Sequence, residues 1–267
     1  MSTMIHPTAI IDSKAELGTD VSIGPYCVVG ADVTIGDGCE LLSHVVITGH
    51  TSMGSGNHVF PFTSIGQIPQ DLKYHGEASQ VIIGDNNQIR ENATINAGTE
   101  GGGMVTRIGH NNLLMAYTHV AHDCLLGNHI VLANCSTLAG HVEVDDQAII
   151  GGLSAIQQFV RIGKLAMIGG MSGVTKDVAP YCLLAGGYRA GLSGLNIIGL
   201  KRKGYNLQQI SKLKEVYRLL LQEKGKRDER LNQAEALLDE HDEVGHSLVD
   251  FVRSAQRGLT THGRDSE

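Results

Sequence analysis

Aliphatic side chains recur at every sixth residue through the first two thirds of the chain. The series runs from 5 to 65, resumes over 83–95 and, after one shift of phase, continues over 108–174. A helix would need apolar residues three and four positions apart, and a long amphipathic strand would need them at every second position. Glycine follows the aliphatic residue in many repeats, a pattern typical of short strands separated by corners. The sequence therefore predicts a mostly β chain, with a parallel β-helix over 1–190 whose coils stack about 4.8 Å apart.

A core built from one aliphatic side chain per repeat explains an unusual composition. The 267 residues include 34 Gly but no Trp, 4 Phe and 7 Tyr. Aromatic side chains normally supply much of the buried area of a core, so we expect stacked Ile, Leu and Val to fill the interior here. We expect many of the glycines to mark corners of the coil.

Two segments interrupt the period. Between Ile65 and Ile83 the expected apolar positions hold Asp71 and Glu77, and a narrow core would not accept these charges unpaired. A protruding loop is therefore predicted at about 66–82. A second loop is predicted at about 96–107, where the spacing lengthens and three consecutive glycines occur. Loops that leave a rigid scaffold are where functional residues concentrate.

The repeats stop near Pro180, and helical spacing of apolar residues follows. We expect 191–267 to form a small helical domain. Its first clear helix begins at Asn206, which opens a capping-box pattern, and two more are expected near 228–239 and 247–257.

Charge and cysteine content exclude several classes of protein. A net charge of -7 argues against a generic nucleic-acid binder, because phosphate contacts need a basic surface. No apolar run is long enough to span a membrane and no signal peptide is evident, so we expect a cytoplasmic protein without membrane insertion. Five cysteines without a CxxC pair favour reduced thiols over a disulfide framework.

Histidine and aspartate gather in one part of the repeat region. If three repeats make one coil, Asp123 and His141 are close to stacking register, with His119 and His122 nearby. A neutral imidazole beside a carboxylate is the arrangement of a general base active near neutral pH. Two other interpretations remain open. The group could be polar decoration of an exposed edge, or His119, His122 and His141 could hold zinc, as three histidines do in gamma-class carbonic anhydrases.

Four motifs make the sequence more specific than its repeats. They are QDLKY at 70–74, THVAHDC at 118–124, TLAGHV at 137–142 and GLKRKG at 199–204. Together they closely resemble the acyl-carrier-protein-dependent UDP-N-acetylglucosamine O-acyltransferases that begin lipid A synthesis. The resemblance covers nearly the whole chain. It implies a left-handed parallel β-helix that assembles as a homotrimer, with an active site in each cleft between subunits.

The resemblance also implies roles for individual residues. His122 corresponds to the general base and Asp123 orients it. The base deprotonates the sugar 3-hydroxyl, which attacks the thioester of a 3-hydroxyacyl chain on acyl carrier protein. Gly140 corresponds to the residue whose backbone N–H stabilises the oxyanion. No metal and no bound cofactor are implied, since phosphopantetheine arrives on the carrier protein. Cys124 is an alternative nucleophile that we disfavour.

The same resemblance assigns residues to two further functions. Gly170 corresponds to the position that sets acyl length, and a glycine there implies a relatively long chain. The expected substrate-binding residues are Asp71, Lys73, His119, His141, Gln157, Gln158, Asn196 and Arg202.

Basic residues of the helical region are expected to form a docking surface for the acidic carrier protein, with an affinity that falls as salt rises. They are Lys201, Lys203, Lys212, Lys214 and Arg218.

Two departures from the family pattern leave alternatives open. Gln157 stands where the family often has histidine, and Asn96-Ala97-Gly98 replaces a more polar sequence. Either change is compatible with a relative that acylates the 3-amino group of a UDP-sugar and forms an amide, or with a sibling hexapeptide acyltransferase of another sugar. A non-catalytic repeat scaffold, such as an ice-binding solenoid, would instead show a monotonous Ser or Thr face.

Overall fold

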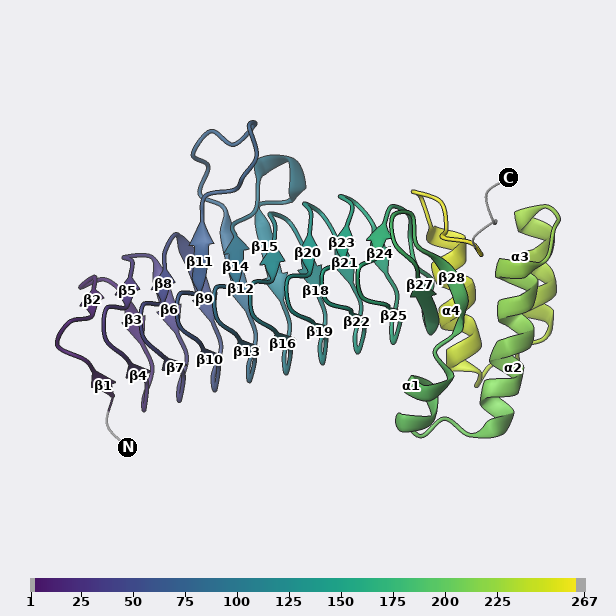
Figure 1. Cartoon of the computed structure of the whole chain (residues 1–267), viewed down its shortest axis with the longest axis horizontal. Helices are drawn as coiled ribbons and strands as arrows, with labels where there is room; N and C mark the ends of the chain where they lie inside the picture. Colours follow the sequence, from purple (N-terminus) through teal and green to yellow (C-terminus); the bar gives the residue numbers. More distant parts are fainter. Residues whose placement is uncertain (1–2, 263–267) are drawn as a thin grey trace.

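A three-sided parallel β-helix followed by a group of helices makes up the computed structural model, which describes residues 3–262 (Figure 1). Its three sheets are called A, B and C here and contain 11, 9 and 8 strands. The register pairs Val120 with Leu138 and Leu132 with Ile150, so three hexads form one coil. The predicted fold class is confirmed.

The strands are short, and successive strands of one sheet belong to successive coils. Sheet A contains β1 (Met4–Ile5), β4 (Ser22–Ile23), β7 (Glu40–Leu41), β10 (His58–Val59), β13 (Gln88–Ile89), β16 (Leu113–Leu114), β19 (Val131–Leu132), β22 (Ile149–Ile150), β25 (Met167–Ile168), β27 (Cys182–Ala185) and β28 (Gly191–Leu195). Sheet B contains β2 (Ile10–Ile11), β5 (Val28–Val29), β8 (Val46–Ile47), β11 (Ser64–Gln67), β14 (Thr94–Asn96), β17 (His119–Val120), β20 (Thr137–Leu138), β23 (Ala155–Ile156) and β26 (Gly173–Val174). Sheet C contains β3 (Glu16–Leu17), β6 (Val33–Ile35), β9 (His50–Met53), β12 (Gln80–Ile83), β15 (Val105–Ile108), β18 (Leu125–Leu126), β21 (Glu143–Val144) and β24 (Arg161–Ile162).

The predicted aliphatic positions form the core from Ile23 to Val174. In the first coil Ile5 is 46% exposed. A second inward position, two residues before each aliphatic residue, was not predicted. It is buried as well, for example at Val21 and Cys27. The core is therefore two side chains wide in each repeat, and small residues occupy the second position.

Asparagines at this second position form a ladder inside the prism. The Asn87 amide nitrogen donates to Asn57 Oδ1 at 3.0 Å and to the carbonyls of Gly84 and Gly109 at 3.2 and 3.0 Å. In turn, Asn87 Oδ1 accepts from the backbone N–H of Asn112 at 2.9 Å. The buried amides thus pair with one another and with the backbone, as buried polar groups must.

The expectation that glycines mark the corners is wrong for many of them. Left-handed backbone at the corners is adopted mainly by other residues, such as Asp123, His141 and Phe159, with φ of 59°, 59° and 65°. Glycines directly after the aliphatic residue instead let the coils approach closely. A Cβ added to Gly84 would lie 2.7 Å from the carbonyl oxygen of Gly109 in the next coil.

Two protrusions leave the helix at the same corner, which leads from sheet B into sheet C and is called the BC corner below. Segment 68–79 joins β11 to β12, and segment 97–104, which includes the 3₁₀ helix Glu100–Gly102, joins β14 to β15. They rise side by side (Figure 1) and touch, since Glu100 N–H donates to Glu77 Oε1 at 3.2 Å.

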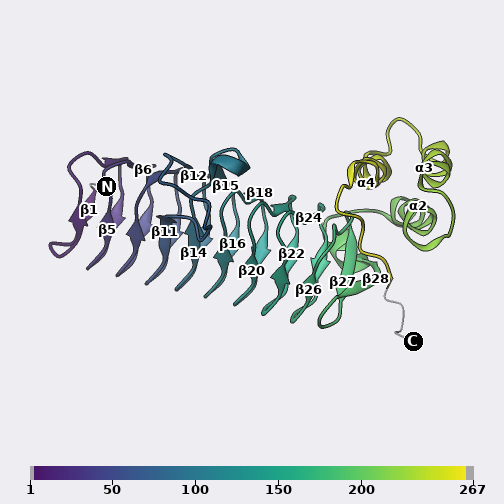
Figure 2. The same cartoon turned by 90° about the horizontal axis from the view of Figure 1, so that it is seen from above.

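The helical region lies beyond the last coils (Figure 2). Strands β27 and β28 pair antiparallel, so sheet A extends to Leu195. The helices are α1 (Ile197–Arg202), α2 (Leu207–Tyr217) with a π-helical continuation (Arg218–Gln222), α3 (Arg227–Ala236) and α4 (Glu243–Ser254). The predicted capping box of Asn206 is present, whereas α1 and the π turn were not predicted. Within 3–262, no helix is long and apolar enough to cross a membrane.

The asparagine ladder predicts a large cost for a small truncation. Asn87→Ala removes the donor to three acceptors and the acceptor for Asn112, so we expect the free energy of unfolding to fall by about 2 to 3 kcal/mol. Chemical denaturation would measure this, with Gln88→Ala at the exposed neighbouring position as control. Equal stability of the two variants would contradict a role for the ladder.

Candidate active site

An imidazole and a carboxylate meet at the BC corner. His122 Nδ1 lies 2.8 Å from Asp123 Oδ2. The side chain of Asp123 is fully buried, whereas that of His122 is 11% exposed. Because a carboxylate accepts hydrogen bonds, this contact assigns the proton to Nδ1 and leaves a lone pair on Nε2. The pair therefore has the geometry of a general base.

The segment 97–104 covers the carboxylate. Thr99 donates twice, from its backbone N–H to Asp123 Oδ1 at 2.8 Å and from Oγ1 to Oδ2 at 2.5 Å. The backbone N–H of Asp123 donates to Thr106 Oγ1 at 2.8 Å. Both carboxylate oxygens are thus hydrogen-bonded. The periodicity marked this segment as a loop but gave no signal that it would fold back onto Asp123.

Two further histidines complete the polar cluster. The ring of His141 stacks on Phe159 at 4.3 Å and meets His122 edge-on at 5.0 Å. Burial lowers the pKa of His141, although the charge of Asp123 opposes this shift. On the outer face of β17, His119 bonds Thr94 Oγ1 at 2.7 Å, and burial, followed by the charge of His122, lowers its pKa. Both rings are therefore neutral at neutral pH and suited to hydrogen bonding.

Gly140 lies directly against the base. A Cβ at this position would lie 2.6 Å from His122 Nε2, closer than real side chains allow. Among the residues described, the Gly140 backbone N–H has no hydrogen-bond partner. The absence of a side chain thus lets the Gly140 backbone approach the His122 ring, and its unpaired N–H is a candidate donor to an oxyanion.

The thiol alternative is wrong. Cys124 is buried, and its Sγ donates to the carbonyl of Ala139 at 3.2 Å. Burial raises its pKa to about 12. A thiol that stays protonated and has no access to solvent is not a nucleophile.

The zinc alternative required His119, His122 and His141. In the described part of the chain, the group close enough to share a metal is instead His122, Asp123 and His141, whose ligand atoms lie within 4.8 Å of one another. Both oxygens of Asp123 already accept hydrogen bonds, one of them from His122 Nδ1. These donor atoms fit a hydrogen-bonded base better than a three-histidine zinc site.

Most of the predicted substrate residues gather at this corner. Asp71 and Lys73 belong to segment 68–79, and their charges act in opposite directions on the pKa of His141. Gln157 and Gln158 are exposed next to Phe159. Beside Asp123 and His141, a cavity of about 730 Å³ is lined by Gly102, Glu143, Phe159, Arg161, Asp177 and Arg257, among others.

Two predicted substrate residues lie elsewhere in the same chain. The Asn196 side chain caps α1 by accepting from Gly199 N–H at 2.9 Å, and it donates to the carbonyl of Leu165 at 3.1 Å. Leu165 occupies the corner between sheets C and A, and Arg202 is the last residue of α1, the helix that Asn196 caps. One chain therefore does not bring Asn196 or Arg202 to His122.

The departure at Asn96 has a structural explanation. Its side chain is 4% exposed, and Nδ2 donates to the carbonyl of Ile68 at 3.1 Å. This hydrogen bond thus fixes segment 68–79 to the coil that contains Asn96. Its side chain is buried between this coil and the segment.

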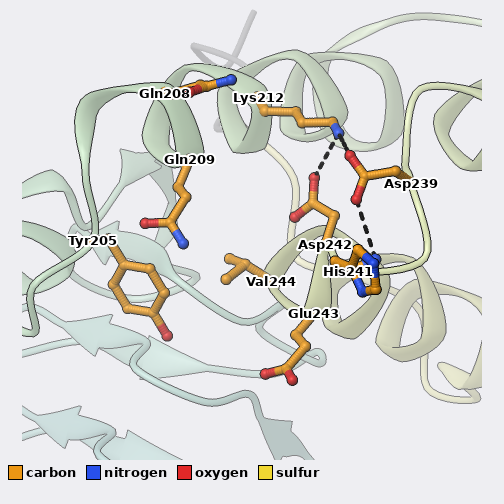
Figure 3. Close-up of a pocket in the computed structure, with 9 residues that line it drawn as sticks. All are labelled: Tyr205, Gln208, Gln209, Lys212, Asp239, His241, Asp242, Glu243 and Val244. Carbon is orange, nitrogen blue, oxygen red and sulfur yellow. Dashed lines mark hydrogen bonds and ion pairs between the residues drawn. The ribbon is translucent and has the colours of Figure 1, made fainter.

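Two of the predicted docking cations are already paired. Lys212 Nζ lies 2.8 Å from Asp239 and 3.2 Å from Asp242 (Figure 3), and Arg218 lies 3.3 Å from Glu223. Lys212 and Arg218 therefore each have a carboxylate partner within the helical region, and their role in docking stays a prediction. The other three predicted docking residues, Lys201, Lys203 and Lys214, are exposed and have no ion pair among the described residues.

A hexapeptide-repeat β-helix with a hydrogen-bonded His–Asp pair beside a glycine has the fold and the candidate site of an acyltransferase. A family model described as UDP N-acetylglucosamine O-acyltransferase, domain 2, matches residues 177–260, and one of bacterial transferase hexapeptide repeats matches 14–49. The chain is 49% identical over 255 residues to the acyl-(acyl-carrier-protein)–UDP-N-acetylglucosamine O-acyltransferase of Thermodesulfovibrio yellowstonii, covering 96% of this chain and 98% of that one.

Other comparisons agree. The enzyme of the same name from Aliarcobacter butzleri is 49% identical over 256 residues, which are 96% of this chain and 97% of that one. The solved UDP-N-acetylglucosamine O-acyltransferase of Moraxella catarrhalis superposes with a TM-score of 0.93 at 44% identity, covering 96% of this chain and 99% of that one. This chain belongs to the UDP-N-acetylglucosamine O-acyltransferase family.

The contact between Gly140 and His122 yields a prediction. Gly140→Ala forces the ring away, so the hydrogen bond from Nδ1 to Asp123 weakens. We expect the low-field Nδ1–H proton resonance of His122 to shift upfield or vanish in NMR spectra. Gly101→Ala is the control, because a Cβ there meets nothing within 4 Å. An unchanged resonance in Gly140→Ala would contradict the described packing.

Proposed function

We propose that this protein transfers a 3-hydroxyacyl chain from acyl carrier protein to the 3-hydroxyl of UDP-N-acetylglucosamine, the first step of lipid A biosynthesis. The observation that carries the proposal is the hydrogen bond between His122 Nδ1 and Asp123, which leaves the Nε2 lone pair free on a ring that lies against Gly140. Relatives that match nearly the whole chain carry the name of this activity.

The arrangement supports direct transfer in two steps. His122 Nε2 removes the proton of the sugar hydroxyl as its oxygen attacks the thioester carbonyl, and Gly140 N–H donates to the oxyanion. When the intermediate collapses, the C–S bond breaks and the phosphopantetheine sulfur takes the proton from His122. Asp123 stabilises the transient imidazolium. No bound cofactor and no metal are required.

A path for the acyl chain follows the outer face of sheet B. The outward-facing residues of this sheet that stack after His119 are Thr137, Ala155 and Gly173. Because their side chains are small, they leave a shallow track toward Gly170. Three steps from one coil to the next, each of about 4.8 Å, give a track of roughly 14 Å. We therefore expect a relatively long acyl chain, with Gly170 at its far end.

We propose that the site is completed in a homotrimer. Asn196 and Arg202, on a different corner from His122, would then reach the substrate bound to a neighbouring subunit. The corner between sheets A and B also exposes large apolar side chains, as protein interfaces do before assembly. These are Tyr26, Phe62, Tyr117, Leu153 and Met171.

The partner that brings the acyl chain is acyl carrier protein, an acidic partner. We propose that it docks on the unpaired cations Lys201, Lys203 and Lys214, where attraction would speed encounter and fall as salt rises. The five cysteines are free thiols, which suits the proposed cytoplasmic location.

Removing the base tests the proposal. We expect His122→Gln to lower kcat at least 100-fold, because glutamine cannot accept the proton. The assay combines UDP-N-acetylglucosamine or its 3-amino analogue with a series of 3-hydroxyacyl carrier proteins, and mass spectrometry identifies the product. His129→Gln, an exposed histidine at another corner, is the matched control.

Full activity of His122→Gln would refute the mechanism, and a product formed only from the amino sugar would move the assignment to an amide-forming relative.

The acyl path predicts a change of chain length. A side chain at Gly170 would occupy the end of the track, so Gly170→Met should shift the preferred donor toward shorter chains at least tenfold, and Gly170→Ala should shift it less. A Cβ there lies 3.2 Å from the carbonyl oxygen of Gly152, so a small local adjustment is expected in both variants. Competition between donors of different length measures the preference, and an unchanged preference would remove Gly170 from the path.

A further inference from the structure

Segment 97–104 is built around the carboxylate of Asp123. Three of the four hydrogen bonds of this residue involve the segment or the strand it enters: its carboxylate accepts two from Thr99, and its backbone N–H donates one to Thr106 Oγ1. Thr99 is 5% exposed and Thr106 is fully buried. The fourth contact is His122.

Glycines allow this segment to approach. A Cβ added to Gly98 would lie 2.8 Å from Asp123 Oδ1, and one added to Gly102 would overlap the carboxylate itself. Neither position has room for a side chain, although Gly101 and Gly103 beside them face open space. The close approach is therefore confined to the residues that surround the carboxylate.

We propose that Thr99 is a positioning residue for acyl transfer: its hydroxyl fixes Asp123 and thereby holds His122 with its lone pair toward the substrate. This inference rests on the proposed role of His122 as general base. Oδ2 of Asp123 is shared between Thr99 Oγ1 at 2.5 Å and His122 Nδ1 at 2.8 Å, so the two donors together determine the rotation of the carboxylate. Such short bonds to a charged acceptor are stronger than neutral ones.

By donating to Oδ2, the Thr99 hydroxyl also partly offsets the negative charge that faces His122. Without it, Oδ2 has His122 as its remaining side-chain donor, and the protonated imidazole is favoured more strongly. Other charged or titratable groups face the pair from neighbouring elements and stay unchanged in the test. They are His119, His141, Asp71, Lys73, Glu143, Arg161, Asp177 and Arg257.

The test compares Thr99→Val, which keeps the shape and lacks the hydroxyl, with Thr99→Ser, which keeps the hydroxyl. For Thr99→Val we expect kcat to fall roughly tenfold at neutral pH, with KM for the sugar nucleotide within about twofold of wild type. The acidic limb of its pH–rate profile should move to higher pH. Thr99→Ser should restore most of the rate and the profile.

Thr63→Val is the matched control, because Thr63 is fully buried and donates to the carbonyl of Arg90 away from the site. It should lower stability without moving the pH profile. A Thr99→Val enzyme with wild-type kcat and profile would overturn the inference, and so would a Thr99→Ser enzyme as impaired as Thr99→Val.

A measurement without turnover separates this inference from the proposed function. Side-chain ¹⁵N NMR of histidine-labelled protein reports the tautomer of His122. We expect the Nδ1–H form in wild type and Thr99→Ser, and a mixture of tautomers at high pH in Thr99→Val. An inactive wild type that shows this pattern would refute the acyl-transfer proposal alone, whereas an unchanged tautomer in Thr99→Val would refute the role of Thr99.

Discussion

Main-chain hydrogen bonds between successive coils are the constraint on which the rest of this structure depends. Ala121 N–H donates to the carbonyl of Leu138, and Ala139 N–H to that of Ile156, both at 3.1 Å. Each coil satisfies its backbone through its neighbours, so residues one coil apart are held in register along the axis. Side chains that are distant in sequence are thereby held one coil apart with little conformational freedom. The relative positions of the site residues are fixed in the same way.

The same constraint explains where the chain permits insertions. An extra residue within a strand would shift the register of every later side chain in that coil. Both protrusions therefore begin and end at a corner, and both use the BC corner. Because 68–79 and 97–104 leave neighbouring coils there, they meet above Asp123, and the second folds back onto the carboxylate. Function is concentrated at this corner because the scaffold tolerates irregular backbone there.

The difference between the regular coils and the irregular segments at the corner also explains what could be predicted from sequence. A strict period predicts the coil, and a spacing of one coil places Asp123 near His141. The ladder of Asn57, Asn87 and Asn112 was missed, because its position is filled elsewhere by Val, Cys, Ala, Ser, Thr or Ile and shows no single residue type. The contact of Thr99 with Asp123 could not be predicted, since periodicity ends where a loop begins. Similarly, the pattern of basic residues that suggested docking by Lys212 contains no information about Asp239 and Asp242, the carboxylates with which Lys212 pairs.

The end of the solenoid connects its stability to the proposed delivery of substrate. A β-helix that stopped after β26 would expose the unpaired edges of its last coil, and such edges invite association. The β27–β28 hairpin and the C-terminal segment cover these edges: Thr260 N–H donates to the carbonyl of Asp177 at 2.7 Å, and Arg161 lies over the ring of Phe251 at 4.5 Å. The helices are thus fixed relative to the coils. If a carrier protein docks on their unpaired lysines, as proposed, it meets the proposed acyl track at a constant distance. The structure that caps the edge would then also determine how far the phosphopantetheine arm must extend.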